Sequence, residues 1–254
     1  MAQQVRSGIG MLSGKAAVIT GAGSGIGKAA ARVFVREGAQ VLAVDFSGAE
    51  KDIAAELGPT VVPFHADVSR EEEIGAMFAA ALQAFGRVDA LMTAAGTQGG
   101  RTPEVTLEEY EAMTAVNLRG VMLCCKHAIR AMLPTGGGAI VNVSSVAGLN
   151  NEERAPIPYA AAKAGVHALT KAYAVEYGAR GVRANVIAPG FTLTELTRRS
   201  PPEVLHEMGG KAALGRAGEA AEQAEVAAFL ISDRASFVTG AVIPVDGGWS
   251  ARTA

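Results

Sequence analysis

Cysteine is scarce in this 254-residue chain, which holds only two, Cys124 and Cys125, side by side. Adjacent cysteines cannot join distant segments, which excludes a small secreted domain built on disulfides. Aromatic residues make up 5% of the chain, whereas glycine is frequent, at 31 residues. We therefore expect an aliphatic core with many tight turns. The two adjacent cysteines fit a reducing compartment, and we expect the protein in the cytoplasm.

An excess of charge of one sign is also missing. The 23 Lys and Arg residues nearly balance the 25 Asp and Glu residues, and the formal net charge is -2. Proteins that bind nucleic acid or an anionic membrane surface need a basic footprint. We expect neither kind of partner.

Long hydrophobic runs and metal-ligand clusters are absent from the sequence. The longest uncharged stretch, residues 131–151, contains Pro134 and three glycines at 136–138, which do not suit a membrane-spanning helix. The N-terminal MAQQVRSGIGML has no apolar core and does not read as a secretory signal. The four histidines lack the HExxH spacing of a zinc site, so we expect no metal.

Short runs rich in Val and Ile alternate with segments of helical periodicity, a pattern typical of parallel strands joined by crossover helices. We expect seven strands, at residues 16–20, 40–44, 60–64, 88–92, 139–143, 183–187 and 241–245. We expect helices after Gly25 and at 74–85, 108–132, 157–178 and 220–231. The pattern predicts an α/β fold with a doubly wound, mostly parallel seven-stranded sheet and helices on both faces.

One helix is marked by a full apolar stripe and a glycine stop. The stripe consists of Ile74, Met77, Phe78, Ala81, Leu82 and Phe85, and Gly86 follows it. No composition shift or flexible linker divides the chain, so we expect a single domain over residues 1–254. Long irregular stretches near 97–107, 146–157 and 191–215 are candidates for function, and the last one predicts a substrate-binding loop and helix insertion.

A glycine-rich turn follows the first expected strand, with the sequence Thr20-Gly21-Ala22-Gly23-Ser24-Gly25-Ile26-Gly27. Glycines let the backbone approach a pyrophosphate, whose charge is stabilised by free N–H groups at the start of the following helix. The spacing, G-x-x-x-G-x-G, is not the general G-x-G-x-x-G pattern, and a merely tight turn is the alternative interpretation. The candidate cofactor-binding residues are Gly21, Gly23, Ser24, Gly25, Ile26 and Gly27.

Asp45 ends the second expected strand, where a carboxylate can accept hydrogen bonds from the hydroxyls of an adenosine ribose. A ribose 2'-phosphate would meet like charge there, and neither Ser24 nor Phe46 supplies a cation. NAD is therefore favoured over NADP. The alternative is that Asp45 caps the next helix.

Tyr159 and Lys163 stand four residues apart on an expected helix, which places both side chains on one face. A nearby ammonium favours the charged form of a phenol, so we expect Lys163 to lower the pKa of Tyr159 and suit it to acid–base chemistry. Ser144 and Ser145 end the fifth strand, where either hydroxyl could hold a carbonyl. Asn117 lies within a helix, an unfavourable place unless it makes a special contact.

Together with Asp67-Val68, Pro189-Gly190 and the terminal VTGAVIPVDGG, these motifs resemble the short-chain dehydrogenase/reductase family along nearly the whole chain. The resemblance implies a Rossmann fold. It also implies that Tyr159 is the general acid/base, that Lys163 binds the nicotinamide ribose, that Ser145 orients the carbonyl and that Asn117 supports a proton relay.

The resemblance extends to further contacts with the dinucleotide. It implies that Asp67 and Val68 flank the adenine and that backbone near Gly96 lines the cofactor. It implies, finally, that the segment Pro189, Gly190, Thr192 and Thr194 meets the nicotinamide carboxamide. Thr93 is a further candidate contact, although the family usually has asparagine there.

We therefore predict a cytoplasmic, NAD-dependent oxidoreductase that transfers hydride between nicotinamide and a secondary alcohol or ketone. An NADP-dependent 3-oxoacyl carrier-protein reductase and a non-catalytic NAD-sensing protein are the alternatives. Apolar faces of the helices near 108–132 and 157–178 suit contacts with further copies of the chain, and the resemblance implies a homotetramer or homodimer.

Overall fold

The fold is organised by one sheet, whose strands run parallel throughout. The computed structural model describes residues 10–98, 103–150 and 155–252. Within these residues the sheet has seven strands in the order β3-β2-β1-β4-β5-β6-β9. The strands are β1 (Ala16–Thr20), β2 (Gln40–Asp45), β3 (Val61–His65), β4 (Ala90–Thr93), β5 (Gly138–Val143), β6 (Val182–Pro189) and β9 (Val242–Val245).

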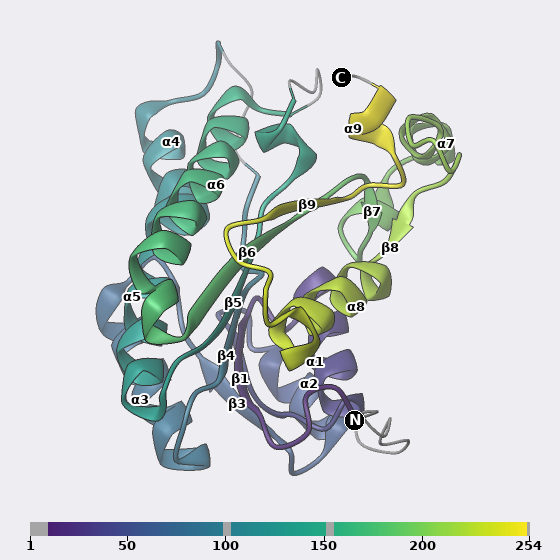
Figure 1. Ribbon diagram of the computed structural model, residues 1–254. Coiled ribbons are helices and arrows are strands. Elements are labelled where there is room, and N and C mark those ends of the chain that lie inside the picture. Colours follow the sequence, from purple (N-terminus) through teal and green to yellow (C-terminus); the bar gives the residue numbers. More distant parts are fainter. Residues whose placement is uncertain (1–9, 99–102, 151–154, 253–254) are drawn as a thin grey trace.

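Helices cover both faces of the sheet (Figure 1). One face carries α1 (Gly25–Arg36), α2 (Glu50–Leu57) and α8 (Ala220–Ile231). The other face carries α3 (Glu71–Phe85), α5 (Val121–Met132) and α6 (Ile157–Tyr177), with α4 (Leu107–Thr114) beside α6. The order of the strands reverses beside β1, so the predicted doubly wound Rossmann sheet is confirmed.

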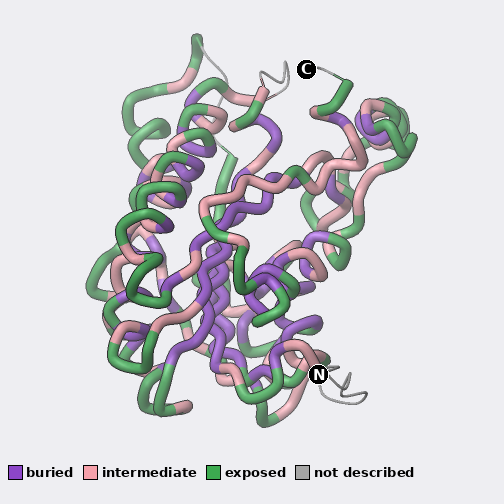
Figure 2. The backbone as a smooth tube through the Cα atoms, viewed as in Figure 1, coloured by how far each residue is buried: buried purple, intermediate pink, exposed green. Residues whose placement is uncertain are grey.

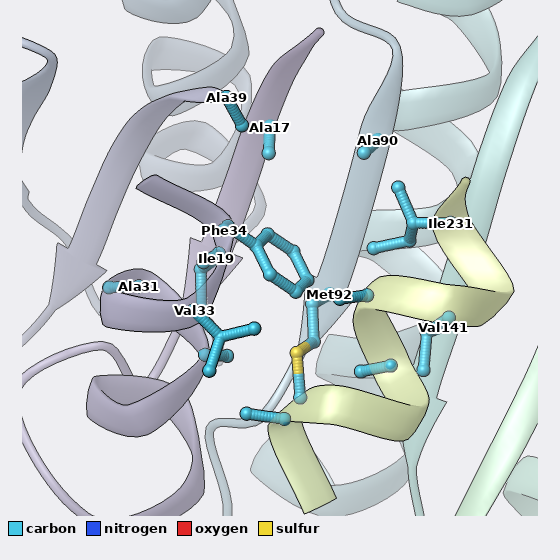
Figure 3. Packing of buried hydrophobic residues seen from close by; sticks show 14 of the residues in the cluster. Ala17, Ile19, Ala31, Val33, Phe34, Ala39, Ala90, Met92, Val141 and Ile231 are labelled. Atoms are coloured by element: carbon cyan, nitrogen blue, oxygen red, sulfur yellow. The ribbon is translucent and has the colours of Figure 1, made fainter. Parts of the chain in front are cut away.

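Each central strand is buried on both faces because its side chains alternate between two cores. In β1, Ala17 and Ile19 join the core under α1 and α8, whereas Val18 joins the core under α3 and α5. Figure 2 shows this buried band running through the middle of the molecule. Figure 3 shows Phe34 of α1 and Met92 of β4 in the first core, close to α8.

The smaller elements gather near one corner of the molecule, at the upper right of Figure 1. They are a two-stranded sheet of β7 (Thr192–Leu193) and β8 (Gly218–Glu219), the helix α7 (Pro202–Gly210) and the C-terminal α9 (Trp249–Arg252). The predicted insertion near 191–215 therefore forms a strand and a helix after β6. That residues 1–254 act as a single domain stays a prediction.

Most expected boundaries agree with the structure within two residues, but two details differ. The predicted apolar stripe lies on α3, but only Ile74, Met77, Phe78 and Ala81 of it are buried, and Leu82 is 40% exposed. The helix expected over 108–132 is interrupted by a π-helical segment, Ala115–Gly120. In the described ranges, no helix is both long and apolar enough to cross a membrane.

Candidate active site

The carboxyl ends of the central strands form one row, because the strands are parallel and in register. Thr20 of β1 pairs with Val44 of β2 and with Thr93 of β4, and Thr93 pairs with Asn142 of β5. The glycine-rich turn, Asp45, Gly96 and Ser145 lie at or just beyond this row. Ligands of open α/β sheets bind at this edge, next to the strand where the order reverses.

The glycine-rich turn is too tight for side chains at Gly21, Gly23 and Gly27. A Cβ on Gly27 would lie 2.1 Å from the carbonyl oxygen of Gly21, and a Cβ on Gly21 would lie 2.6 Å from the amide nitrogen of Ala95. The helix α1 begins at Gly25, and Ser24 at its N-cap makes no capping hydrogen bond through its side chain. A close-packed backbone followed by a helix N-terminus fits a pyrophosphate group.

Asp45 is nearly buried and connects the turn to the end of β2. Its Oδ2 accepts a hydrogen bond from the amide of Gly23 at 3.0 Å. Its Oδ1 accepts from the amide and hydroxyl of Ser47, at 2.9 and 2.7 Å. The alternative role of capping the next helix does not apply, since α2 has Ala49 as its N-cap, with no side-chain bond.

A carboxylate from a distant segment lies at the start of α1. Glu195, which follows β7, accepts a hydrogen bond from the amide of Gly25 through Oε2, at 2.7 Å. Burial opposes ionisation of Glu195, but backbone hydrogen bonds and the charges of Lys28 and Arg32 hold its pKa below the ordinary value. Sequence reasoning missed Glu195, because the two residues are 170 positions apart and neither has a signal that indicates the other.

The segment after β6 lies against the glycine-rich turn. The methyl carbon of Thr194 would be 3.2 Å from a Cβ on Gly25. Thr192 donates to the carbonyl of Gly190 at 3.0 Å. This segment, which includes Pro189 at the end of β6, therefore reaches the start of α1, as the predicted contacts with a dinucleotide require.

The remaining predicted contacts follow β3 and β4. Asp67 accepts from the amide of Ser69 at 2.8 Å, and Val68 is buried in the core. Thr93 directs its hydroxyl into the protein, where it donates to Oδ1 of Asn142 at 2.8 Å. A Cβ on Gly96 would lie 3.0 Å from Oδ1 of Asn117 and 3.7 Å from Nζ of Lys163, so Gly96 adjoins the candidate catalytic residues.

Three of the candidate catalytic side chains meet where α6 crosses the end of β5. Lys163 is buried, with 4% exposed, and its Nζ donates to the carbonyl of Val143 at 3.0 Å. The same Nζ lies 5.5 Å from the centroid of the Tyr159 ring. The hydroxyl of Tyr159 is hydrogen-bonded to the side chain of Ser145.

The two adjacent serines at the end of β5 point to different partners. Ser145 reaches Tyr159 and also accepts from the amide of Ala147 at 3.2 Å. Ser144 is buried and bonds instead to the backbone of Lys163 and to His167. The geometry therefore brings Ser145, and not Ser144, to the phenol.

Asn117 makes the special contact that its position in a helix requires. It is fully buried within the π-helical segment. Its Nδ2 donates to the carbonyl of Thr97 at 2.7 Å, and its Oδ1 accepts from the amide of Thr97 at 3.1 Å. The π-helical turn thus holds the segment that follows β4, beside Gly96, and such turns are frequent at functional sites.

The pKa values differ from the expectation for Tyr159. Burial raises the pKa of this phenol and outweighs the hydrogen bond with Ser145, which acts to lower it. Burial also lowers the pKa of Lys163 to about 8. The expectation that Lys163 lowers the pKa of Tyr159 is thus not met, because its ammonium lies over the ring face and bonds to Val143 rather than to the phenolic oxygen.

An apolar cluster adjoins the site at the end of β5. Val146, Met208 and Trp249 are buried together, and Phe191 and Val204 pack against them. The cluster joins the turn after Ser145 to α7 and α9. Among the residues that the structure describes, no group of three His, Cys, Asp or Glu side chains is arranged to hold a metal ion. The charged residues Glu152, Glu153 and Arg154, whose sequence predicts a solvated loop edge, lie outside the described residues.

Comparison with known proteins gives consistent matches over nearly the whole chain. A family model described as enoyl-(acyl carrier protein) reductase matches residues 21–250. The cis-4-hydroxycyclohexanecarboxylate dehydrogenase of Sinomonas cyclohexanicum is 40% identical over 242 residues, which cover 93% of this chain and 97% of that protein.

Two further relatives match over similar lengths. The 3-oxoacyl-[acyl-carrier-protein] reductase FabG of Thermotoga maritima is 39% identical over 93% of this chain and 98% of its own length. The crystal structure of levodione reductase superposes with a TM-score of 0.89 at 37% identity, covering 94% of this chain and 99% of the other. The chain is thus an oxidoreductase of the short-chain dehydrogenase/reductase family, whose members use a nicotinamide cofactor.

Proposed function

We propose that the protein is an NAD(H)-dependent oxidoreductase that interconverts a secondary alcohol and a ketone. The observation that carries the proposal is the convergence of Ser145, Tyr159 and Lys163 at the carboxyl edge of the sheet, beside a glycine turn shaped for a pyrophosphate. When bound, the nicotinamide supplies the hydride donor or acceptor. The residues of the chain supply the proton and hold the reacting carbonyl.

Tyr159 is proposed as the group that exchanges the hydroxyl proton of the substrate. A phenol with a raised pKa is neutral at physiological pH and is a proton donor, which suits ketone reduction. Ser145, bonded to Tyr159, is placed to orient the same oxygen. Lys163 and Asn117 hold the backbone at Val143 and Thr97 on either side of the site, and Lys163 is the proposed contact with the nicotinamide ribose.

The preference for NAD over NADP is supported by the charges around β2. Asp45 presents a carboxylate beside the glycine turn, where it disfavours a 2'-phosphate. The flanking positions hold Ser24 and Phe46, and neither carries a positive charge. The related FabG keeps the alternative open, namely an NADP-dependent 3-oxoacyl carrier-protein reductase.

The proposed substrate is a secondary alcohol or ketone with an apolar body. The cluster of Val146, Met208 and Trp249 supports this class, because the side chains next to Ser145 are apolar and carry no charge. One relative is named for a hydroxycyclohexanecarboxylate, and a structural neighbour for reduction of levodione.

We also propose that the chain works as a homotetramer or homodimer in the cytoplasm. An apolar groove of about 670 Å³ runs between the π-helical segment and α6, lined by Leu118, Met122, Gly165, Ala168 and neighbouring residues. Burial of this groove against a second copy accounts for its apolar lining. Both cysteines are free and buried, which agrees with a reducing compartment.

The proposal is tested with a panel of secondary alcohols and ketones, assayed with NAD(H) and NADP(H) by nicotinamide absorbance. We expect turnover with at least one uncharged alcohol and a clearly lower KM for NAD. Turnover only with NADPH and a 3-oxoacyl thioester favours the reductase alternative. NADH binding without turnover of any substrate favours a non-catalytic sensor.

A further inference from the structure

His167 is a buried titratable side chain that the proposed mechanism does not use. It lies on α6, four residues after Lys163 and eight after Tyr159, so the three side chains share one face of the helix. Only 8% of His167 is exposed. Its Nε2 lies 2.7 Å from the hydroxyl oxygen of Ser144.

The hydrogen bonds around Ser144 assign the direction of this contact. Ser144 donates its only hydroxyl proton to the backbone carbonyl of Lys163, at 3.0 Å. The oxygen of Ser144 must then accept from His167, so Nε2 carries a proton. Burial, together with the charges of Lys171 and Lys163, lowers the pKa of His167, which keeps the ring neutral with this one N–H.

His167 also lies against the turn on the far side of Ser145. A Cβ on Gly148 would be 3.0 Å from Cε1 of His167 and 2.8 Å from the carbonyl carbon of Lys163. The turn therefore packs directly on α6, with no room for a side chain at Gly148. His167 thus contacts Ser144 and lies next to Gly148, and these two residues stand on either side of Ser145 in the sequence.

We infer that His167 is a positioning residue, which fixes the Ser145 turn on α6 and so sets the distance between Ser145 and Tyr159. This inference rests on the proposed function. His167 acts through two hydrogen bonds in series, one to the hydroxyl of Ser144 and one from Ser144 to the carbonyl of Lys163. Small displacements of reacting groups reduce the rate of the chemical step strongly, while binding of the dinucleotide depends on other segments.

The test compares His167→Leu, His167→Gln, Ser144→Ala and the double variant His167→Leu/Ser144→Ala. We expect His167→Leu to lower kcat by roughly ten- to a hundredfold, with the Kd for NADH unchanged within twofold. His167→Gln retains an N–H donor and should restore most of kcat. If His167 acts through Ser144, the double variant should lose no more activity than the stronger single variant.

His127→Leu is the matched control, because His127 stacks on Phe78 and faces Glu71, far from this contact. A kcat for His167→Leu within twofold of the wild type, or fully additive losses in the double variant, would overturn the inference. Should His167→Leu fail to fold, Ser144→Ala serves as the test, because it removes a single oxygen. A kcat for Ser144→Ala within twofold of the wild type would then overturn the inference. A wild-type chain without turnover would instead contradict the proposed function.

Discussion

The side chain of Lys163 is buried, and burial disfavours its charged form, which lowers its pKa to about 8. An unfolded lysine ionises near 10.5, so between pH 8 and 10.5 the unfolded chain binds more protons than the folded one. Stability therefore rises with pH through this window, and the destabilisation is fully present below pH 8. Lys163 is retained at a cost in stability, as expected of a residue kept for function.

We predict that Lys163→Met stabilises the fold at pH 7 while abolishing turnover. Methionine fills a similar volume without a charge, so the free energy of unfolding should rise by up to roughly 3 kcal/mol. The gain should vanish above pH 10.5, where the wild-type lysine is neutral. Urea denaturation at pH 7 and pH 10.5 measures both effects, and a variant less stable than wild type at pH 7 would contradict the assigned burial penalty.

Glycine is required at position 27 because the neighbouring backbone leaves no room for a side chain, not because of its φ angle. A Cβ there would lie 2.1 Å from the Gly21 oxygen. We predict that Gly27→Ala destabilises the fold by about 1–3 kcal/mol and weakens NADH binding at least tenfold. Gly178→Ala is the control, because nothing lies within 4 Å of that position and its φ of -57° suits any residue. Thermal unfolding and NADH fluorescence titration report the two effects, and equal behaviour of the variants would disprove the steric argument.

The role of a residue could be predicted from the sequence where its signals are local, and not where its contacts are with distant segments. Asn117, Tyr159 and Lys163 could be proposed from local spacing and helix position, because those signals lie within one turn or one element. The pairing of Ser145 with Tyr159, the contact of His167 with Ser144 and that of Glu195 with Gly25 depend on tertiary packing. The raised pKa of Tyr159 was missed for a related reason, since spacing predicts neither burial nor the atom that Lys163 faces.

At the scale of elements, the segment after β6 is attached to α1 through the carboxylate of Glu195. A negative charge at a helix N-terminus is stabilised by the free amides and the helix dipole. The same segment carries Thr192 and Thr194, the proposed contacts with the nicotinamide. The segment after β6 and the glycine-rich turn therefore form one hydrogen-bonded unit.

We predict that Glu195→Gln loosens this unit. The amide of glutamine can still accept from Gly25 but lacks the negative charge, so the hydrogen bond should weaken by about 1 kcal/mol and amide hydrogen exchange should speed several-fold at Gly25 and across residues 192–199. Glu203→Gln is the control, since Glu203 is exposed in the first turn of α7. Exchange at these amides that stays at the wild-type rate would show that Glu195 does not hold the segment.

The elements themselves followed from apolar periodicity, because strands buried on both faces and helices with one apolar stripe leave strong patterns. The interruption of the expected 108–132 helix at Ala115–Gly120 left no such pattern, since a π-helical turn inserts without changing composition. The exposure of Leu82 likewise depends on how far α3 is rotated over the sheet.

At the scale of the whole molecule, the apolar groove beside α6 is the strongest indication of an assembly. Ala168 lines the groove and is exposed, so a charge there would disturb the proposed contact between copies without disturbing the fold of one copy. We predict that Ala168→Glu lowers the mass measured by light scattering to that of a smaller species. Lys51→Glu on α2 should keep the wild-type mass, and an unchanged mass for Ala168→Glu would place the interface elsewhere.

The central claim is that the phenolic oxygen of Tyr159 exchanges the proton that accompanies hydride transfer. Tyr159→Phe removes that oxygen and leaves the ring, so its kcat should fall by at least about a hundredfold. The Kd for NADH should stay within a few-fold of the wild-type value, because the glycine turn and Asp45 are untouched. Near-wild-type turnover by Tyr159→Phe would contradict the claim directly.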